Sequence, residues 1–436
     1  MNSDTLDLTR GSVPLCLIRF SFPLLLANLL QSFYSMADLL VVGRFVGETG
    51  LAAVSSASTL CFLLNAVCMG FSAGGTVLTA RARGAGDRLE EEEAAAALLL
   101  LALAGSALLT AAALLCYRPL FTLMALPSQA MGDACGYMAI LCWGTPFVFG
   151  YNAVCAILKG RGDSRGPLRF VAAAAVVNLL LDLILAGPCG LGTAGTAWAT
   201  VAAQGVSFLL SLAHLHRCVP LRPAALLSLL RLGLPSAVQI AVVNLSYLIL
   251  TGLLNPFGVS VAAAAGIGLK VSTFAGMPCW ALGYGVTAMV GQNLGAGDPD
   301  RVRQTVRSGL LLSLGATALL TALVQLAAAP IIALFEPENA AVTAEGVRYL
   351  RICCSVNGLI YAAMYVFDSF AIGSGASWVA MCNAMLDAAL LRLPLCWLLA
   401  FPLALGPAGI YLGQAFSPIL PALAGLCYFR LRCRRS

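Results

Sequence analysis

The sequence predicts an all-α polytopic membrane protein with twelve transmembrane helices in two six-helix lobes. Composition is the first indication, because 60% of the 436 residues are hydrophobic and only 10% are charged, whereas about 25% of residues are charged in a typical soluble protein. Secondly, the apolar residues fall into segments of about 20 residues or more, each long enough to cross a bilayer as one helix. Thirdly, short motifs recur in the same order at offsets of 211 to 214 residues.

The apolar segments are separated by short stretches that are rich in glycine, proline or charge, as expected of loops between spans. We expect spans near residues 15–42, 51–80, 94–116, 134–158, 168–187 and 193–213, and again near 232–255, 261–290, 308–333, 347–372, 377–400 and 408–429.

Lysine and arginine are distributed unequally among the loops. With a cytoplasmic N-terminus, the cytoplasmic segments contain 19 of the 25 lysines and arginines. The opposite side then contains Arg44, Arg118, Arg348 and Arg351. Because cytoplasmic loops carry an excess of basic residues, we expect a multi-pass protein of the plasma membrane with both termini in the cytoplasm.

The repeated motifs indicate a duplicated six-helix unit. Gly84-Ala-Gly-Asp87 recurs as Gly295-Ala-Gly-Asp298, and Pro23 recurs as Pro235. An even number of spans per unit brings both halves into the membrane from the same side, so a pseudo-two-fold axis would run along the membrane normal, as in many secondary transporters. The predicted parts are an N-terminal lobe (1–213), a cytoplasmic linker (214–231) and a C-terminal lobe (232–436).

The predicted N-terminal lobe contains polar residues at positions where charge is costly. Asp38 is the one ionisable residue between Phe20 and Val42, and intramembrane acids are usually functional. Asn178 and Asp182 are one turn apart on one face of the fifth span, and Thr200 lies in the sixth. By the helical rise, all four lie in the outer half of the lobe.

Carboxylate, amide and hydroxyl oxygens suit two tasks. They can coordinate a hard monovalent cation, or they can share a proton. Alternatively, each acid pairs with a local arginine or caps a helix.

The predicted C-terminal lobe carries a different set of ionisable residues. Lys270 lies in the eighth span, and Asp387 and Arg392 lie in the eleventh. Three roles are open for these residues. Lys270 could form an ion pair with Asp387, Arg392 could form a salt bridge, or Lys270 could contact the substrate. Asp368 is expected to face the cytoplasmic interface.

Several function classes are disfavoured. No Walker A sequence is present, which argues against ATP as the direct energy source. The two Gly-x-Gly-Asp motifs resemble those of intramembrane aspartyl proteases, but charged loop residues flank both. There is no nucleophile–base set, and the cysteines lack a Cys-x-x-Cys spacing. We therefore expect no enzyme activity, no catalytic residues, no cofactor and no nucleic-acid partner.

The ordered motifs resemble those of a known transporter family. The stretch Gln31-Ser-Phe-Tyr34-Ser-Met-Ala-Asp38-Leu-Leu-Val-Val-Gly43 resembles the start of multidrug and toxic compound extrusion (MATE) transporters. Gly291-Gln-Asn-Leu-Gly295-Ala-Gly-Asp298 is similar to the matching signature of the second lobe. Asn178-Leu-Leu-Leu-Asp182 and Leu391-Arg-Leu-Pro394 resemble the fifth and eleventh helices of that family.

The resemblance implies a twelve-helix antiporter that exports organic cations and other amphipathic compounds against inward H⁺ or Na⁺. In the bacterial branch with its cation site in the N-terminal lobe, the coupling residues match Asp38, Asn178 and Asp182, and Thr200 matches a sixth-helix hydroxyl. Pro23 matches a proline at which the first helix is proposed to bend.

Our hypothesis is therefore monomeric, cation-coupled multidrug efflux by alternating access, with H⁺ or Na⁺ as the coupling ion. We expect small amphipathic, mostly cationic substrates in a cavity between the lobes. The predicted lining residues are Tyr34, Phe147, Phe149, Lys270 and Met277. The alternative is a lipid or lipid-linked oligosaccharide flippase of the same superfamily, which a strongly cationic cavity would favour.

Overall fold

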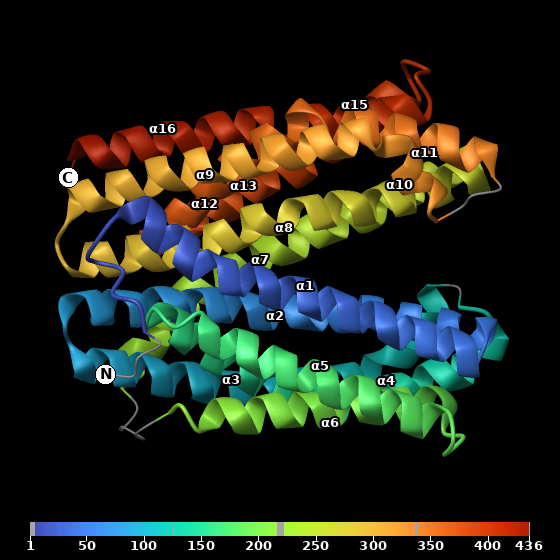
Figure 1. Ribbon diagram of the computed structural model, residues 1–436, viewed down its shortest axis with the longest axis horizontal. Helices are drawn as coiled ribbons and strands as arrows, with labels where there is room; N and C mark the ends of the chain where they lie inside the picture. The colour runs from blue at the N-terminus through green and yellow to red at the C-terminus, as the bar shows by residue number, and fades with distance from the viewer. Residues whose placement is uncertain (1–4, 125, 216–221, 336–338, 436) are drawn as a thin grey trace. The chain divides into compact units, whose positions relative to one another are not determined.

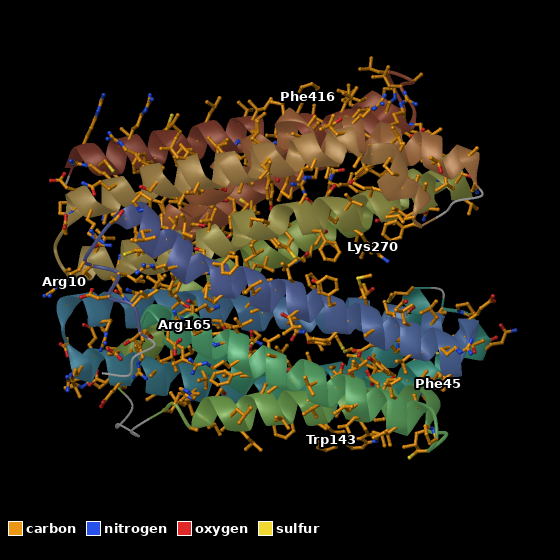
Figure 2. All side chains as sticks on the ribbon, in the orientation of Figure 1. Arg10, Phe45, Trp143, Arg165, Lys270 and Phe416 are labelled. Atoms are coloured by element: carbon orange, nitrogen blue, oxygen red, sulfur yellow. The ribbon has the colours of Figure 1, made fainter. Side chains whose placement is uncertain are left out.

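The computed structural model describes residues 5–124, 126–215, 222–335 and 339–435, and these residues form an all-α protein (Figure 1). Twelve helices among them are long and apolar enough, by length and composition, to cross a membrane. The predicted fold class is confirmed. Many large apolar side chains are exposed, among them Trp143 at 67% and Phe416 at 55% (Figure 2). Such exposure is expected where lipid replaces water as the solvent.

The first seven helices are long and continuous. They are α1 (Val13–Phe45), α2 (Glu48–Ala85), α3 (Arg88–Leu123), α4 (Ser128–Gly160), α5 (Arg165–Ala186), α6 (Gly192–Leu212) and α7 (Pro223–Leu254). Because α7 begins at Pro223, part of the predicted linker is helical, whereas residues 216–221 of that linker lie outside the described residues.

The helices in the second half of the chain are mostly shorter and are interrupted more often. It contains the 3₁₀ turn η1 (Asn255–Phe257), α8 (Val259–Gly295), α9 (Pro299–Leu326), α10 (Ala328–Ala333), α11 (Ala340–Cys353), α12 (Val356–Gly373), α13 (Ser377–Met385), the π-helical segment η2 (Leu386–Arg392), α14 (Leu393–Ala400), α15 (Pro407–Phe416) and α16 (Ile419–Arg435). Pro418, between α15 and α16, has no backbone N–H to continue the helix.

The two Gly-Ala-Gly-Asp motifs form equivalent turns. Gly86 and Gly297 have φ of 74° and 73°, a left-handed conformation that glycine adopts without strain. Asp87 then caps α3 by accepting from the Glu90 amide at 3.0 Å, and Asp298 caps α9 through the Arg301 amide at 2.9 Å. Both aspartates therefore act as N-caps, a structural role that replaces the protease interpretation.

The duplication extends to the packing between helices. Thr76 on α2 donates to the Ala156 carbonyl on α4 at 3.1 Å, and Thr287 on α8 donates to the Ser369 carbonyl on α12 at 3.2 Å. One turn later, Gly160 and Gly373 have no room for a side chain, because an added Cβ would lie 2.9 Å from the Thr76 carbonyl oxygen and 2.7 Å from that of Thr287. Both halves thus use the same close helix contact.

The chain divides into two compact units. Unit 1 contains residues 1–6 and 26–237, and unit 2 contains residues 7–25 and 238–436. These differ from the predicted lobes, because α1 and α7 each contribute to both units. The divisions lie shortly after Pro23 and Pro235, the prolines inside these two helices.

In unit 1, α4 packs against α2, α3 and α6, while α5 packs against α6. The first half of α7 approaches α2 closely, since a Cβ added to Gly70 would lie 2.2 Å from the Ala237 backbone nitrogen. In unit 2, α12 packs against α8, α9 and α16.

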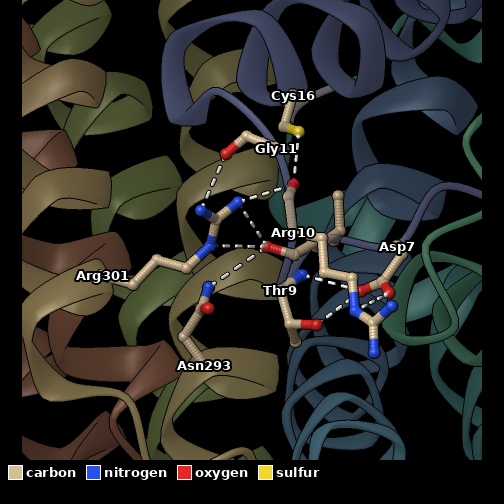
Figure 3. Close-up of polar contacts among 8 residues, drawn as sticks. Asp7, Thr9, Arg10, Gly11, Cys16, Asn293 and Arg301 are labelled. Carbon is tan, nitrogen blue, oxygen red and sulfur yellow. Dashed lines mark hydrogen bonds and ion pairs between the residues drawn. The ribbon is translucent and has the colours of Figure 1, made fainter.

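An N-terminal strap, residues 7–12, lies against α8 and α9 of unit 2 (Figure 3). Arg301 donates to the carbonyls of Arg10 and Gly11, both at 2.8 Å, and Asn293 donates to that of Leu8 at 3.3 Å. Burial alone would raise the pKa of Asp7, but hydrogen bonds from Thr9 and the nearby charges of Arg10 and Arg301 lower it below its ordinary value.

Candidate functional site

Unit 1 brings together the four polar residues that the sequence analysis singled out. Asp38 comes from the second half of α1, and its carboxyl group interacts with Asp182 and Asn178 of α5. Asp182 is 0% exposed and Asn178 is 1% exposed. Thr200 of α6 lies 3.5 Å from the Asn178 side-chain nitrogen and donates its hydroxyl to the Thr196 carbonyl at 3.0 Å. Three helices therefore converge on one polar cluster.

Several oxygens of this cluster have no hydrogen-bond donor among the described residues. They are both carboxylate oxygens of Asp182, Oδ1 of Asp38 and Oδ1 of Asn178. A buried acceptor without a donor costs about 1–3 kcal/mol, and more when it is charged. A proton or a hard monovalent cation would satisfy these oxygens, because carboxylate and amide oxygens are ligands for both. The cluster therefore fits the coupling ion that the sequence predicts.

Two tyrosines adjoin the cluster. Tyr34 is one helical turn before Asp38, and its hydroxyl interacts with the side chains of Gln31 and Gln204. Tyr137 of α4 interacts with Thr200 and lies within electrostatic range of Asp38 and Asp182. Tyr34 was predicted from the sequence to line the cavity, whereas Tyr137 was not predicted to belong to any site, since nothing in the sequence shows which face of α4 meets α6.

The remaining predicted cavity residues have different environments. Phe147 is half-buried, with its ring centroid 6.3 Å from that of Phe208. Phe149 is 3% exposed within a hydrophobic core that includes Cys68 and Ala153, and Met277 is also 3% exposed. Both side chains are packed among neighbouring residues, and their assignment to the cavity stays a prediction. Pro23 is buried inside α1.

In unit 2, the buried cation pairs with the acid of its own helix. Arg392 forms a salt bridge with Asp387, donates to the Ser246 hydroxyl at 3.0 Å, and lies 4.7 Å from the centre of the Tyr247 ring. Arg392 and Asp387 are each 1% exposed. The structure therefore selects the salt-bridged Arg392 over a Lys270–Asp387 pair.

Lys270 and Asp368 complete the set of predicted ionisable residues in this unit. Lys270 is exposed on α8 (Figure 2). Asp368 is 4% exposed and accepts from the Asn383 side chain at 2.7 Å. The expectation that Asp368 faces the cytoplasmic interface was wrong, because its helix turns the carboxylate towards α13 inside the unit.

Comparison with known proteins identifies the family. A family model described as MatE matches residues 23–184 and, a second time, residues 235–398. The chain belongs to the MATE family. The two matches begin at Pro23 and Pro235, so they coincide with the repeat found in the sequence.

Curated bacterial relatives span nearly the same length as this MATE chain. The probable multidrug resistance protein YpnP of Bacillus subtilis is 28% identical over 440 residues, covering 97% of this chain and 96% of YpnP. The probable multidrug resistance protein YoeA of the same organism is 30% identical over 337 residues, covering 73% of each chain.

A solved structure shows the same fold. It is an outward-facing multidrug resistance MATE family transporter of the MOP superfamily, with a TM-score of 0.92 and 20% identity, covering 100% of this chain and 99% of that one. Membership of the MATE family places the protein among membrane transporters rather than enzymes, as the sequence analysis expected.

Proposed function

We propose that this MATE transporter exports small amphipathic, mostly cationic compounds by antiport against H⁺ or Na⁺. The observation that carries the proposal is the pairing of the half-buried Asp38 with the buried Asp182, three of whose four carboxylate oxygens have no hydrogen-bond donor among the described residues. Two like charges repel strongly in a low-dielectric interior. A bound proton or Na⁺ removes that repulsion, so occupancy of the cluster changes how firmly α1 is held against α5.

Coupling requires that the ion bind the two states of the transporter unequally, because an ion with equal affinity for both shifts nothing. In the proposed cycle, Asp38, Asn178, Asp182 and Thr200 bind the ion from the outer side. Ion binding draws the second half of α1 towards α5 and α6, and this movement releases the substrate.

Pro23 supplies a place for α1 to bend. A proline inside a helix removes one backbone hydrogen bond and commonly kinks the helix. Pro23 lies two residues before the point where α1 passes from unit 2 to unit 1. We propose that the two parts of α1 change their angle there when the ion binds.

The substrate is proposed to contact aromatic side chains near the ion cluster. Tyr34 lies one turn from Asp38, and Phe147 is half-buried on α4. An aromatic face attracts organic cations. Because Arg392 is neutralised by Asp387, it adds no net charge towards the strongly cationic cavity that would favour the flippase alternative.

The proposed setting is the plasma membrane, with both termini in the cytoplasm and the protein acting as a monomer. The basic residues support this orientation, since 19 of 25 fall on the predicted cytoplasmic side. The inner end of the protein then contains the N-terminal strap and the C-terminal part of α16.

Efflux of a fluorescent organic cation such as ethidium from energised cells tests the proposal. We expect Asp38→Asn and Asp182→Asn to reduce efflux to the level of cells without the transporter, at unchanged membrane abundance. Asp368→Asn is the matched control, because it removes a buried acid from unit 2. Wild-type efflux in both cluster variants would refute the coupling site.

A further inference from the structure

A basic hollow lies in unit 2 where the start of α9 meets the end of α16. Its volume is about 470 Å³. The lining residues are Arg303, Arg307, Phe429, Arg430, Cys433 and Arg434. Figure 1 shows these two helix ends side by side. Nothing in the proposed transport cycle uses this hollow.

Arg303 links the two helices that form the hollow. Arg303 of α9 donates to the Cys433 carbonyl of α16 at 2.5 Å and to Asp300 at 2.9 Å. Arg307 is one turn further along α9 and is exposed. Asp300 therefore neutralises Arg303, while Arg307 contributes an additional positive charge.

The α16 side adds two more cations and an aromatic wall. Arg430 and Arg434 are one turn apart, so they lie on the same face of α16, and both are exposed. Phe429 is anchored edge-on against Phe370, with ring centroids 5.1 Å apart. The hollow thus combines guanidinium groups with an apolar wall.

The equivalent helix of the first repeat, α3, lacks the two arginines that α9 contributes to the hollow. At the repeat offset of 211 residues, Arg303 and Arg307 correspond to Glu92 and Ala96 of α3. Like charges grouped within about 10 Å repel one another at physiological salt. The general excess of basic residues on the cytoplasmic side accounts for their number, whereas their grouping around one hollow is accounted for by an anion that binds there.

Exposed leucines lie further along the same two helices, one turn beyond Arg307 on α9 and about two turns before Arg430 on α16. Leu311 follows Arg307 by one turn and is 73% exposed, and Leu423 of α16 is 51% exposed. Guanidinium groups bind phosphate through paired hydrogen bonds, while the leucines match acyl chains. Basic pockets between transmembrane helices on the cytoplasmic side are suited to phospholipid headgroups.

We propose that this hollow binds the phosphate of an anionic phospholipid of the cytoplasmic leaflet. The group that it recognises is a phosphate, which a lipid headgroup or free phosphate could supply. The exposed leucines further along α9 and α16 favour the lipid, because free phosphate gains nothing from an apolar surface.

Native mass spectrometry of the full-length protein, released from nanodiscs that contain phosphatidylglycerol or phosphatidylcholine, tests this proposal. We expect the wild type to retain phosphatidylglycerol in preference to phosphatidylcholine. The double variant Arg307→Gln/Arg430→Gln should weaken this binding about 30-fold. Arg307→Lys/Arg430→Lys keeps the charge but loses the paired hydrogen bonds, so its affinity should lie between those of the wild type and the glutamine variant.

The matched control is Arg10→Gln/Arg88→Gln, which removes the same charge from two exposed arginines at the inner end. It should bind phosphatidylglycerol like the wild type. Equal loss in the control and the test variant, no loss in the test variant, or equal retention of the two lipids would overturn the proposal. Complete displacement of the lipid by inorganic phosphate would overturn the lipid assignment, whereas retention against phosphate supports it.

Discussion

Asp38 of α1 and Asp182 of α5 interact through their carboxyl groups inside unit 1, and neither oxygen of Asp182 has a hydrogen-bond donor among the described residues. The two acids belong to helices far apart in the sequence, so whatever binds between them joins α1 to α5. This relationship is the physical basis for proposing that an ion controls the position of α1.

Tyr137→Phe tests whether the cluster includes a fourth helix. Removing the hydroxyl deletes an interaction with Thr200, which is worth about 1 kcal/mol. We expect the concentration of coupling ion needed for half-maximal transport to change about fivefold, at unchanged protein abundance. Tyr117→Phe on α3, where the ring packs against Phe121, is the control. An identical ion dependence in Tyr137→Phe and wild type would exclude this role.

Pro23→Ala tests the bend in α1. Alanine restores the missing backbone donor and favours a straight helix, so we expect a lower maximal efflux rate with the fold intact. Pro235→Ala changes the equivalent residue of α7, which has Leu250 where the repeat would place an acid. The efflux rate should fall much less in that variant. Equal rates in both proline variants would contradict a special role for Pro23.

Arg392→Met tests the buried pair of unit 2. Removing one partner leaves the Asp387 charge uncompensated, which costs about 3–5 kcal/mol. We expect a large drop in the thermal unfolding temperature of the purified protein in detergent. The double variant Asp387→Leu/Arg392→Met removes both charges and should recover most of that loss. A single variant as stable as the wild type would show that the pair contributes nothing.

Arg301→Gln tests how the N-terminal strap is held. Because Arg301 donates to the Arg10 and Gly11 carbonyls, its loss should free the peptide bond after Arg10. We expect trypsin to cleave there about tenfold faster. Arg303→Gln is the control, since its side chain contacts Asp300 and Cys433. Unchanged cleavage in Arg301→Gln would mean that other contacts hold the strap.

The helices and the repeat were accessible from the sequence, because long apolar segments and recurring turn motifs are local signals. The grouping of Asp38, Asn178, Asp182 and Thr200 followed from depth along each helix. Tyr137 was missed because its role depends on how α4 packs against α6, which no local pattern encodes. The cavity assignment of Phe149 stays a prediction for the same reason, since an aromatic residue in a span can face a cavity or the core.

The Asp387–Arg392 salt bridge could not be predicted from the sequence, because the spacing of the two residues is misleading. Residues five apart point about 140° away from each other on a regular α-helix, so α-helical spacing argues against this contact. The segment Leu386–Arg392 is instead π-helical, and its wider turn brings residues five apart onto one face. The division of α1 and α7 between the units was likewise not visible, because each reads as one continuous apolar segment.

The most direct test of the account uses purified transporter in liposomes with separately imposed pH and Na⁺ gradients, and it measures substrate movement driven by each gradient. One of the two gradients should drive transport in the wild type. Neither gradient should drive transport in Asp38→Asn or Asp182→Asn, while both variants still bind the substrate. Gradient-driven transport at the wild-type rate in either variant would contradict the assignment of ion coupling to this pair.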